Sequence, residues 1–377
     1  MPDTAPPRPT DPLVDDPTAA AAGPLLDPSC DLVTLLRALV DIESVSGNER
    51  MIADEVERAL SGHAHLEVIR DGDAVVARTQ LGRSERVVVA GHLDTVPVAG
   101  NLPSQLEGDR VVGRGTCDMK GGVAVALKAA CELTEPVRDV TWIFYDNEEV
   151  ESARNGLGRL GRNRPDLLTA DFAVLMEPTG AVVEGGCQGT MRFTIRTRGV
   201  AAHSARSWLG HNAIHDLTRV LDRINTFDAR EIEVDGLLYH EGLNAVAVRG
   251  GIAGNVVPDW AEVDVNYRFA PDKTPEEADG LMRHLFEGLD YRCDDLAPGA
   301  RPGLRAPAAA AFITAVGGTP RAKYGWTDVA RFAELGVPAV NFGPADPGKA
   351  HADDEFCPVA DLETCHAALT RWLGARA

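Results

Sequence analysis

Features that would place this 377-residue chain in a narrow class of proteins are missing or scarce. No apolar run approaches the roughly 18–20 residues that a membrane-spanning helix needs, so no membrane span is predicted. Basic residues are the minority, with 37 Lys and Arg against 57 Asp and Glu and a formal net charge of −20. This balance argues against a nucleic acid or an anionic membrane as partner, because both need basic patches. A small anionic ligand is not excluded, since it needs only a few local arginines.

Cysteine is present without a pattern. The seven cysteines are widely spaced, their number is odd, and no C-x-x-C pair occurs. A disulfide framework is therefore not predicted, and a reducing cytoplasm suits the chain best. Residues 1–28 are rich in Pro, Ala and Asp and lack the basic start and apolar core of a signal peptide. We expect them to form a mobile tail.

The order of the apolar segments predicts an α/β fold with an insertion. Between residues 29 and 186, strand-like runs such as VTWIFY and FAVLM alternate with helical ones. Such alternation favours a mostly parallel sheet that is covered on both faces. Residues 187–297 change to a strand–helix–strand–strand–helix pattern, which predicts a small inserted α+β domain. The α/β pattern returns in residues 298–377, so both flanking segments are assigned to one catalytic domain.

Acidic and histidine residues gather where the predicted strands end. Five of them follow apolar strands and a sixth lies in a glycine-rich turn before a helix: His92, Glu148, Glu149, Glu177 and His351, with Asp118 in the turn. In a parallel sheet the C-terminal strand ends share one edge, and ligands bind in the crevice there. We therefore expect these side chains to converge.

The residue types suit a metal centre. Imidazole and carboxylate ligands without thiolate favour zinc, with cobalt and manganese as alternatives. Two histidines and three carboxylates exceed the three protein ligands that are usual at one open zinc, and they suit two ions that share a carboxylate. Asp118 is the bridging candidate, because the helix N-terminus behind it favours its ionised form.

Each of these residues also has an ordinary interpretation. His92 alone would more often be a loop histidine, and adjacent acids such as Glu148 and Glu149 are usually solvated. Glu177 could be a strand-end charge. His351, in the acidic loop of residues 351–355, could belong to the surface. All of these interpretations would have to hold together at separate strand and turn ends, which favours the metal centre.

A longer pattern resembles a known family. It consists of GHLDTVP at residues 91–97, GRGxxDMKGG at residues 113–122, and the pair Glu148-Glu149. It resembles the metallopeptidase family that contains aminoacylases, acetylornithine deacetylase, glutamate carboxypeptidases and succinyl-diaminopimelate desuccinylase. The resemblance extends from about residue 31 to the C-terminus. It implies a zinc-exopeptidase-like catalytic domain and an inserted, ferredoxin-like domain that acts as lid and dimerisation unit.

The resemblance also implies a role for each residue of the cluster. One zinc would be bound by His92 and Glu177, the other by Glu149 and His351, and Asp118 would bridge them. Asp94 would hydrogen-bond the far nitrogen of His92 and so fix its tautomer. Glu148 would be the general base, which takes a proton from the attacking water and passes it to the departing amine.

The inserted segment carries a further part of the resemblance. The sequence GVAAHS at residues 199–204 resembles the family's lid motif, whose histidine crosses from the partner subunit and donates to the oxyanion. This implies a catalytic role for His203 and a homodimer formed through the inserted domain. Trp208 stands near a position where many relatives have proline.

Other segments indicate the amide that is cut. Residues 184–190, 202–208, 254–258 and 325–332 most resemble the actinobacterial type of succinyl-diaminopimelate desuccinylase, which hydrolyses N-succinyl-LL-2,6-diaminopimelate to succinate and LL-diaminopimelate. That substrate has three carboxylates, and arginine is the better residue for bidentate carboxylate binding. The candidates for substrate binding are Arg268 and Arg331, with Asn244 and Thr327 as neutral hydrogen-bonding groups.

Two alternatives remain open at this point. Gly325-Trp326-Thr327-Asp328 departs from the Gly-Thr-Ser-Asp type of other desuccinylases, so the substrate could instead be N-acetylornithine or that of another N-acyl-amino-acid deacylase or carboxypeptidase. A catalytically inactive, peptidase-like binding protein is the alternative from another class. The presence of every expected ligand, Asp94 and Glu148 speaks against it.

Overall fold

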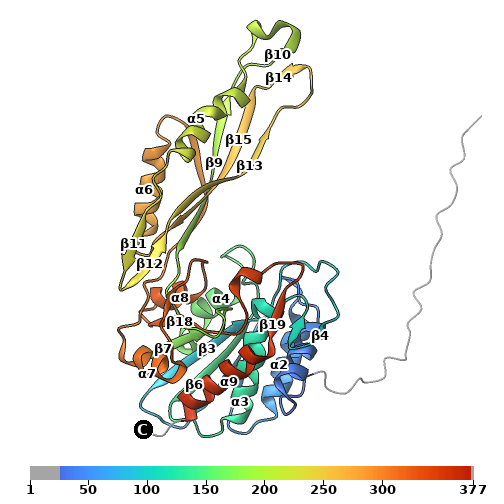
Figure 1. The fold of residues 1–377 in the computed structure, drawn as a ribbon, viewed down its shortest axis with the longest axis vertical. Coiled ribbons are helices and arrows are strands. Elements are labelled where there is room, and N and C mark those ends of the chain that lie inside the picture. Colours follow the sequence, from blue (N-terminus) through green and yellow to red (C-terminus); the bar gives the residue numbers. More distant parts are fainter. Residues whose placement is uncertain (1–25, 375–377) are drawn as a thin grey trace, which may run out of the picture.

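The computed structural model describes residues 26–374 and consists of a main region and an inserted region (Figure 1). The inserted region begins after β8 (Glu184–Gly185) and ends with β16 (Asp290–Ala297), and it extends away from the main region. Most of the expected N-terminal tail lies outside the described residues. Leu26, however, is buried in the core, so the packed part of the chain begins slightly before the predicted boundary.

The main region is built on an eight-stranded sheet with the order β1-β2-β6-β3-β7-β18-β8-β17. The remaining strand bounds are β1 Glu67–Asp71, β2 Ala74–Arg78, β3 Arg86–His92, β6 Asp139–Tyr145, β7 Phe172–Leu175, β17 Arg321–Ala322 and β18 Ala339–Asn341. The four central strands β6, β3, β7 and β18 run parallel, whereas β1, β2 and β8 add antiparallel pairs. The predicted mostly parallel sheet is confirmed. The strand β2, which pairs with β1 through a tight turn at Gly72 (φ +60°), was not predicted from the sequence.

Helices cover both faces of this sheet, as expected. One face is covered by α1 (Leu32–Asp41), α2 (Arg50–Ser61), α3 (Gly121–Glu132), α7 (Pro307–Val316) and α9 (Val359–Gly374), and the other by α4 (Gly156–Asn163) and α8 (Val329–Glu334). Successive side chains of a strand point to opposite faces. On β3, Val87 and Val89 accordingly join the first core, and Val88 and Ala90 the second. This double burial explains why the strand has no polar alternation.

Smaller elements surround the ends of the central strands. A three-stranded sheet contains β4 (Gln105–Glu107), β5 (Arg110–Val112) and β19 (Phe356–Pro358). Short helical turns are η1 (Thr116–Lys120), η2 (Pro165–Leu167) and η4 (Pro347–Lys349). Within the described part of the chain, no helix has the length and apolar character needed to cross a membrane. All seven cysteines are unpaired.

The inserted region contains a four-stranded antiparallel sheet with the order β13-β15-β9-β16. Its elements are β9 (Gly189–Arg198), α5 (Ala213–Asn225), β13 (Gly242–Gly250), β15 (Trp260–Phe269), α6 (Pro275–Leu285) and β16. This is the strand–helix–strand–strand–helix–strand arrangement of ferredoxin-like folds, and β16 completes the predicted pattern. The two helices cover one face of the sheet, where Phe193 and Val265 are buried. Thr274 caps α6 and forms a capping box with Glu277.

The two ends of the inserted region differ. The hairpin of β11 (Glu231–Val234) and β12 (Leu237–His240) lies next to the main region, whereas β10 (Ala202–His203) and β14 (Val256–Val257) lie at the far tip (Figure 1). The turn η3 (Ser204–Leu209) follows β10. The sheet places β13 at its edge, paired with β15 on one side only. Along this edge strand, Val246 and Val248 are exposed by 60% and 56%.

Candidate active site

The end of β3 places His92 in the interior, beside Asp94. The ring nitrogen Nδ1 of His92 lies 3.0 Å from the backbone carbonyl of Asp94 and 3.5 Å from its carboxylate Oδ1. A proton on Nδ1 leaves Nε2 with its lone pair toward the cluster. The contact that orients the ring is therefore made by the backbone of Asp94, with the carboxylate slightly farther away. This refines the expected side-chain hydrogen bond.

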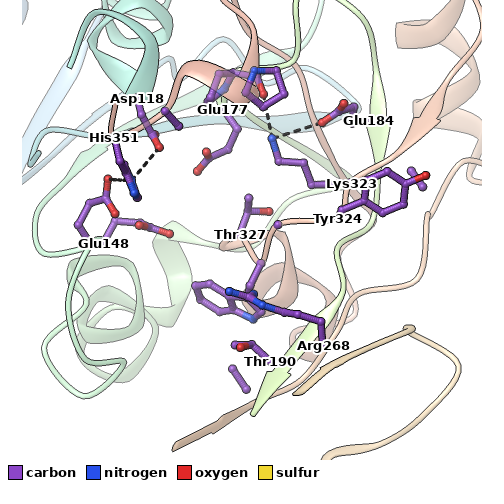
Figure 2. Close-up of a pocket in the computed structure, with 18 of the residues that line it drawn as sticks. Asp118, Glu148, Glu177, Glu184, Thr190, Arg268, Lys323, Tyr324, Thr327 and His351 are labelled. Carbon is purple, nitrogen blue, oxygen red and sulfur yellow. Dashed lines mark hydrogen bonds and ion pairs between the residues drawn. The ribbon is translucent and has the colours of Figure 1, made fainter. Parts of the chain in front are cut away.

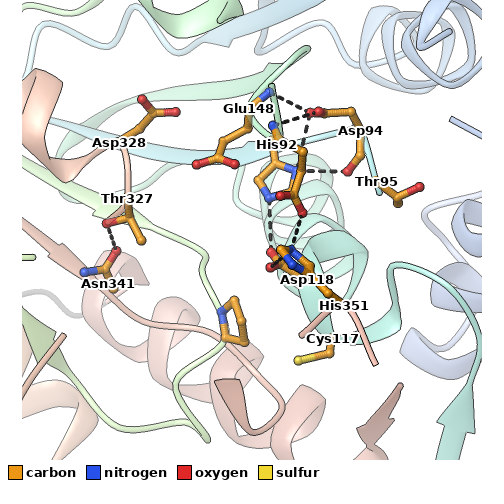
Figure 3. Close-up of polar contacts among 12 residues, drawn as sticks. His92, Asp94, Thr95, Cys117, Asp118, Glu148, Thr327, Asp328, Asn341 and His351 are labelled. Atoms are coloured by element: carbon orange, nitrogen blue, oxygen red, sulfur yellow. Dashed lines mark hydrogen bonds and ion pairs between the residues drawn. The ribbon is translucent and has the colours of Figure 1, made fainter. Parts of the chain in front are cut away.

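The carboxylate of Asp94 has a second task that the sequence did not indicate. It accepts the backbone N–H group of Glu148 at 3.0 Å (Figure 3). It also accepts the backbone N–H of Glu149 at 3.0 Å and the hydroxyl of Ser46 at 2.7 Å. Asp94 is fully buried. It therefore joins the loop after β3 to the loop after β6, and holds the two glutamates in position.

Asp118 lies between the two histidines. Its Oδ1 is 3.1 Å from Nε2 of His92, and its Oδ2 is 3.4 Å from Nε2 of His351. Burial raises the pKa of Asp118, but the hydrogen bonds with His351 and His92 lower it by a larger amount. The net shift of this pKa is therefore downward. An ionised carboxylate that offers one oxygen to each side has the arrangement expected of a bridging ligand.

Glu149 and His351 meet on the far side of Asp118. The Nε2 atom of His351 is 2.8 Å from Oε1 of Glu149. Hydrogen bonds with Asp118 and Glu149 raise the pKa of His351 to about 10. The chain reaches His351 through the turn η4 after β18, so this histidine is farther from its strand end than the sequence suggested.

Glu177 and Glu148 complete the cluster with one buried and one half-buried carboxyl group. Burial and the nearby Asp118 raise the pKa of Glu177 to about 8. Its Oε1 atom is buried and has no hydrogen-bond partner among residues 26–374. Burial also raises the pKa of Glu148 well above its usual value. Buried carboxylates without partners are costly, and a bound cation would remove that cost.

The donor set fits metal ions. Ligand atoms of His92, Asp118 and Glu149 lie within 4.8 Å of one another, and Glu177 and His351 line the same pocket (Figure 2). Imidazole nitrogen and carboxylate oxygen are the ligands of zinc, cobalt and manganese sites. All five predicted ligands thus converge at one edge of the sheet, and the orphaned oxygen of Glu177 is satisfied if an ion binds there.

The cluster opens into a cavity of about 960 Å³ between the main and inserted regions. Thr190 and Arg268 lie across this pocket from Asp118 and His351 (Figure 2). Arg268, on β15, has no hydrogen bond or ion pair with any described residue, and burial lowers the pKa of its guanidinium. An unpaired, half-buried arginine in a pocket is suited to receive a carboxylate.

Arg331 also lines the pocket but is already occupied. Its Nε donates to Asp328 at 2.5 Å and its Nη2 donates to Ser152 at 3.1 Å. The guanidinium also lies over the ring of Trp326, 5.6 Å from the centroid. Of the two predicted arginines, only Arg268 is free to bind an anion without breaking an existing pair.

The other predicted residues are distributed differently. Thr327 is buried in the pocket wall and donates to Oδ1 of Asn341 at 2.8 Å. Asn244 is exposed on the edge strand β13 and does not line the pocket, so within one chain it cannot contact a ligand there. His203 is exposed at the tip of the inserted region, where its Nδ1 accepts the backbone N–H of Ala205. A single chain therefore does not bring His203 to the cluster.

Two pocket residues, Lys323 and Glu184, were not predicted from the sequence. Nζ of Lys323 donates to the carbonyl of Pro178 at 2.8 Å and lies 3.3 Å from Oε2 of Glu184. Both side chains are almost fully buried in the pocket wall. Neither has a motif of its own, because their pairing depends on β17 lying beside β8.

Comparison with known sequences identifies relatives along almost the whole chain. Residues 88–375 match the profile of peptidase family M20/M25/M40. A succinyl-diaminopimelate desuccinylase of Corynebacterium glutamicum is 45% identical over 364 residues, covering 93% of this chain and 98% of the relative. A Mycobacterium tuberculosis protein, provisionally assigned as succinyl-diaminopimelate desuccinylase DapE, is 55% identical over 353 residues, covering 93% of this chain and 100% of the relative.

Solved structures share the fold at low sequence identity. A Bacillus subtilis protein described as a dinuclear metal-binding peptidase of the M20 family superposes with a TM-score of 0.68. The match covers 90% of this chain and 96% of that protein, at 17% identity. The arrangement of sheet, helices and inserted region is thus that of known metallopeptidases.

Proposed function

Because the chain belongs to peptidase family M20/M25/M40, we propose that it is a di-metal amidohydrolase that converts N-succinyl-LL-2,6-diaminopimelate to succinate and LL-2,6-diaminopimelate. The observation that carries this proposal is the pocket itself, which has a carboxylate and imidazole cluster on one side and the unpaired Arg268 on the other. The first can hold metal ions next to an amide, and the second can receive a carboxylate of the substrate.

The division of the ligands between two metal ions follows the family resemblance, and the contacts of Asp118 with both histidines support it. His92 and Glu177 would hold one ion, Glu149 and His351 the other, with Asp118 between them. Bound ions of this kind polarise an amide carbonyl and stabilise the negative charge that develops on its oxygen. We propose zinc, with cobalt and manganese as alternatives. Metal analysis of the purified protein, with an expected ratio of two ions per chain, tests the assignment.

Proton transfer is assigned to Glu148. This carboxyl lines the pocket and is held by its backbone N–H, which donates to Asp94. A general base must reach the attacking water and then the leaving nitrogen, so a carboxylate next to the metal ligands is well placed. Its raised pKa, caused mainly by burial, brings proton uptake and release closer to neutral pH.

The substrate is tested by a direct comparison. We expect N-succinyl-LL-2,6-diaminopimelate to be hydrolysed with a higher kcat/KM than N-acetylornithine, because the succinyl carboxylate can meet Arg268. An equal or higher kcat/KM for the acetyl compound would contradict the substrate and leave the reaction class intact. Full metal loading with no turnover of either compound would instead favour the binding-protein alternative.

We further propose a homodimer formed through residues 187–297, with residues 29–186 and 298–377 as the catalytic domain. The support is the edge strand β13, whose free side carries the exposed Val246 and Val248. An apolar edge strand is prone to pair with another chain, and a twofold contact would cover it. Such a dimer would allow the tip with His203 to reach the partner's pocket. Sedimentation of the purified protein checks the dimer.

The acidic character of the chain argues against a nucleic acid or an anionic membrane as partner, because both need basic patches. We therefore propose a small-molecule substrate and neither a nucleic acid nor a membrane as partner. The seven unpaired cysteines favour a reducing compartment, and we propose the cytoplasm.

A further inference from the structure

Three of the five proposed metal ligands lie in loops or turns or directly border one. His92 is followed by the loop of residues 93–104, Asp118 lies in η1, and His351 precedes β19. Loops are more mobile than the elements that they connect. Metal ligands must nevertheless be held within a few tenths of an ångström, so something must hold these loops together.

Glu355 lies where two of the loops meet. Its Oε1 accepts the backbone N–H of Cys117 at 2.9 Å and that of Asp118 at 3.0 Å. Its own carbonyl accepts the N–H of Gly113 at 3.1 Å. The side chain is 1% exposed, whereas that of Asp353, two positions earlier, is 86% exposed. Glu355 is therefore an interior residue within a loop whose sequence looks like an acidic surface.

Arg114 completes the contact and reaches the third loop. Its Nη1 donates to Oε2 of Glu355 at 2.9 Å and to the carbonyl of Ala352, next to His351, at 3.2 Å. Its Nε donates to the carbonyl of Pro97, in the loop that follows His92, at 3.1 Å. The guanidinium is almost completely buried. One ion pair thus contacts the backbone of the segments that contain Asp118 and His351 and of the loop that follows His92.

We propose that Glu355 and Arg114 are positioning residues of the metal centre, which hold the loop after His92 and the segments of Asp118 and His351 in the arrangement that two metal ions require. Neither side chain is among the proposed ligands. The inference rests on the proposed metal centre, because it concerns the affinity of that centre. Residues that hold metal ligands from behind typically change metal affinity 10- to 100-fold when they are replaced.

A purely structural role is the competing explanation. Breaking any buried ion pair leaves an uncompensated charge and destabilises the fold. The two roles are separated by the zinc affinity of the folded, metal-free protein, measured by calorimetric titration with zinc chloride. In Glu355→Gln the amide nitrogen faces the guanidinium and the ion pair is lost. We expect zinc to bind about 10- to 100-fold more weakly than to the wild type.

A double variant makes the test sharper. Arg114→Met combined with Glu355→Leu removes both charges of the ion pair, so neither partner is left unpaired and much of the thermal stability should return. The N–H groups of Cys117 and Asp118 still have no acceptor, so zinc affinity should stay low. Recovery of wild-type zinc affinity in the double variant would overturn the proposal, as would unchanged affinity in Glu355→Gln.

Asp139 provides a matched control. Its buried carboxylate also accepts two backbone N–H groups, those of Leu81 at 2.8 Å and Arg83 at 2.9 Å, but at the start of β6. This is the opposite end of the sheet from the metal ligands. Asp139→Asn should lower the melting temperature and leave zinc affinity unchanged. A wild-type protein that binds no zinc would contradict the proposed function. Failure of the positioning role would instead appear as zinc binding by the wild type that the Glu355 variants retain unchanged.

Discussion

The metal-ligand cluster of the main region and the open sheet face of the inserted region differ in how their charged residues are paired. At the edge of the main sheet, Glu177 is buried with an oxygen that has no partner among the described residues. On the sheet face of the inserted region that α5 and α6 leave open, charges are paired across strands, as in Arg249 with Asp264 at 2.7 Å and Arg198 with Asp290 at 3.3 Å. Arg268, at the pocket end of this face, is without such a pair.

This difference distinguishes exposed, paired charges, which have little effect on stability, from buried charges without partners, which indicate a binding site. Exposed ion pairs contribute little, about 0–1 kcal/mol each, and serve mainly solubility. Buried groups without partners reduce stability and mark candidate sites for ligands. By this criterion the inserted region contributes Arg268 to the site, and the main region contributes the metal cluster.

The largest effect is expected at the general base. Replacing Glu148 by Gln should lower kcat by about 10²–10⁴-fold, because the variant cannot accept a proton from water. The metal content should remain two ions per chain, since Glu148 is not a proposed ligand. Initial rates and metal analysis of the same preparation test both statements. An unchanged rate would exclude Glu148 as the base. It would also weaken the proposal that the main region supplies the catalytic group.

The next effect concerns the tip of the inserted region. His203→Ala should lower kcat by roughly 10²–10³-fold, as the loss of an oxyanion donor does, if the tip enters the partner's pocket. Mixing this variant with Glu148→Gln should restore activity, because a mixed dimer contains one intact site. His211→Ala, an exposed histidine paired with Asp216 near the tip, is the control and should keep full activity. Failure of the mixture to regain activity would argue against the crossing.

A smaller effect distinguishes the two pocket arginines. Arg268→Met should lower kcat/KM for the succinylated substrate about 10- to 100-fold, because a charged hydrogen bond contributes about 1.5–3 kcal/mol. Arg331→Met should reduce it less, since Arg331 is engaged by Asp328 and Ser152. Steady-state kinetics of both variants decide the order. The reverse order would show that pairing within the free protein does not predict which arginine binds substrate.

The smallest effect is a dependence of stability on pH. The pKa of His351 is raised to about 10, so its ion pairs stabilise the metal-free protein fully below pH 6.5 and are lost as pH rises toward 10. Burial raises the pKa of Glu177 to about 8, so ionisation of this carboxyl also reduces stability as pH rises from about 4.5 toward 8. The metal-free protein should therefore melt at a lower temperature at pH 9 than at pH 6.

Zinc should act in the opposite direction, because it replaces the protons on both groups. The difference in melting temperature between metal-loaded and metal-free protein should widen from pH 6 to pH 9. Thermal melts in matched buffers measure it. A constant difference would mean that these two groups do not exchange protons for metal.

Much of the fold followed from local patterns. Continuous apolar runs such as β3 and β6 indicated strands buried on both faces, and the change of pattern near residue 187 marked the insertion. The strands β2 and β16 were missed, because a short strand next to a tight turn or at the end of a domain has little periodicity of its own.

The sequence by itself determined which residues are candidate metal ligands, since ligand types, glycine-rich turns and most strand ends are local properties. Only the tertiary structure decided which charges are free. It showed that Arg268 has no hydrogen-bond or ion-pair partner within residues 26–374 while Arg331 has two hydrogen-bond partners, and that Glu355 is an interior residue near the exposed Asp353. The physical reason is distance along the chain: the partners of Glu355 lie more than 200 positions away, and no local pattern encodes which side chains packing brings together.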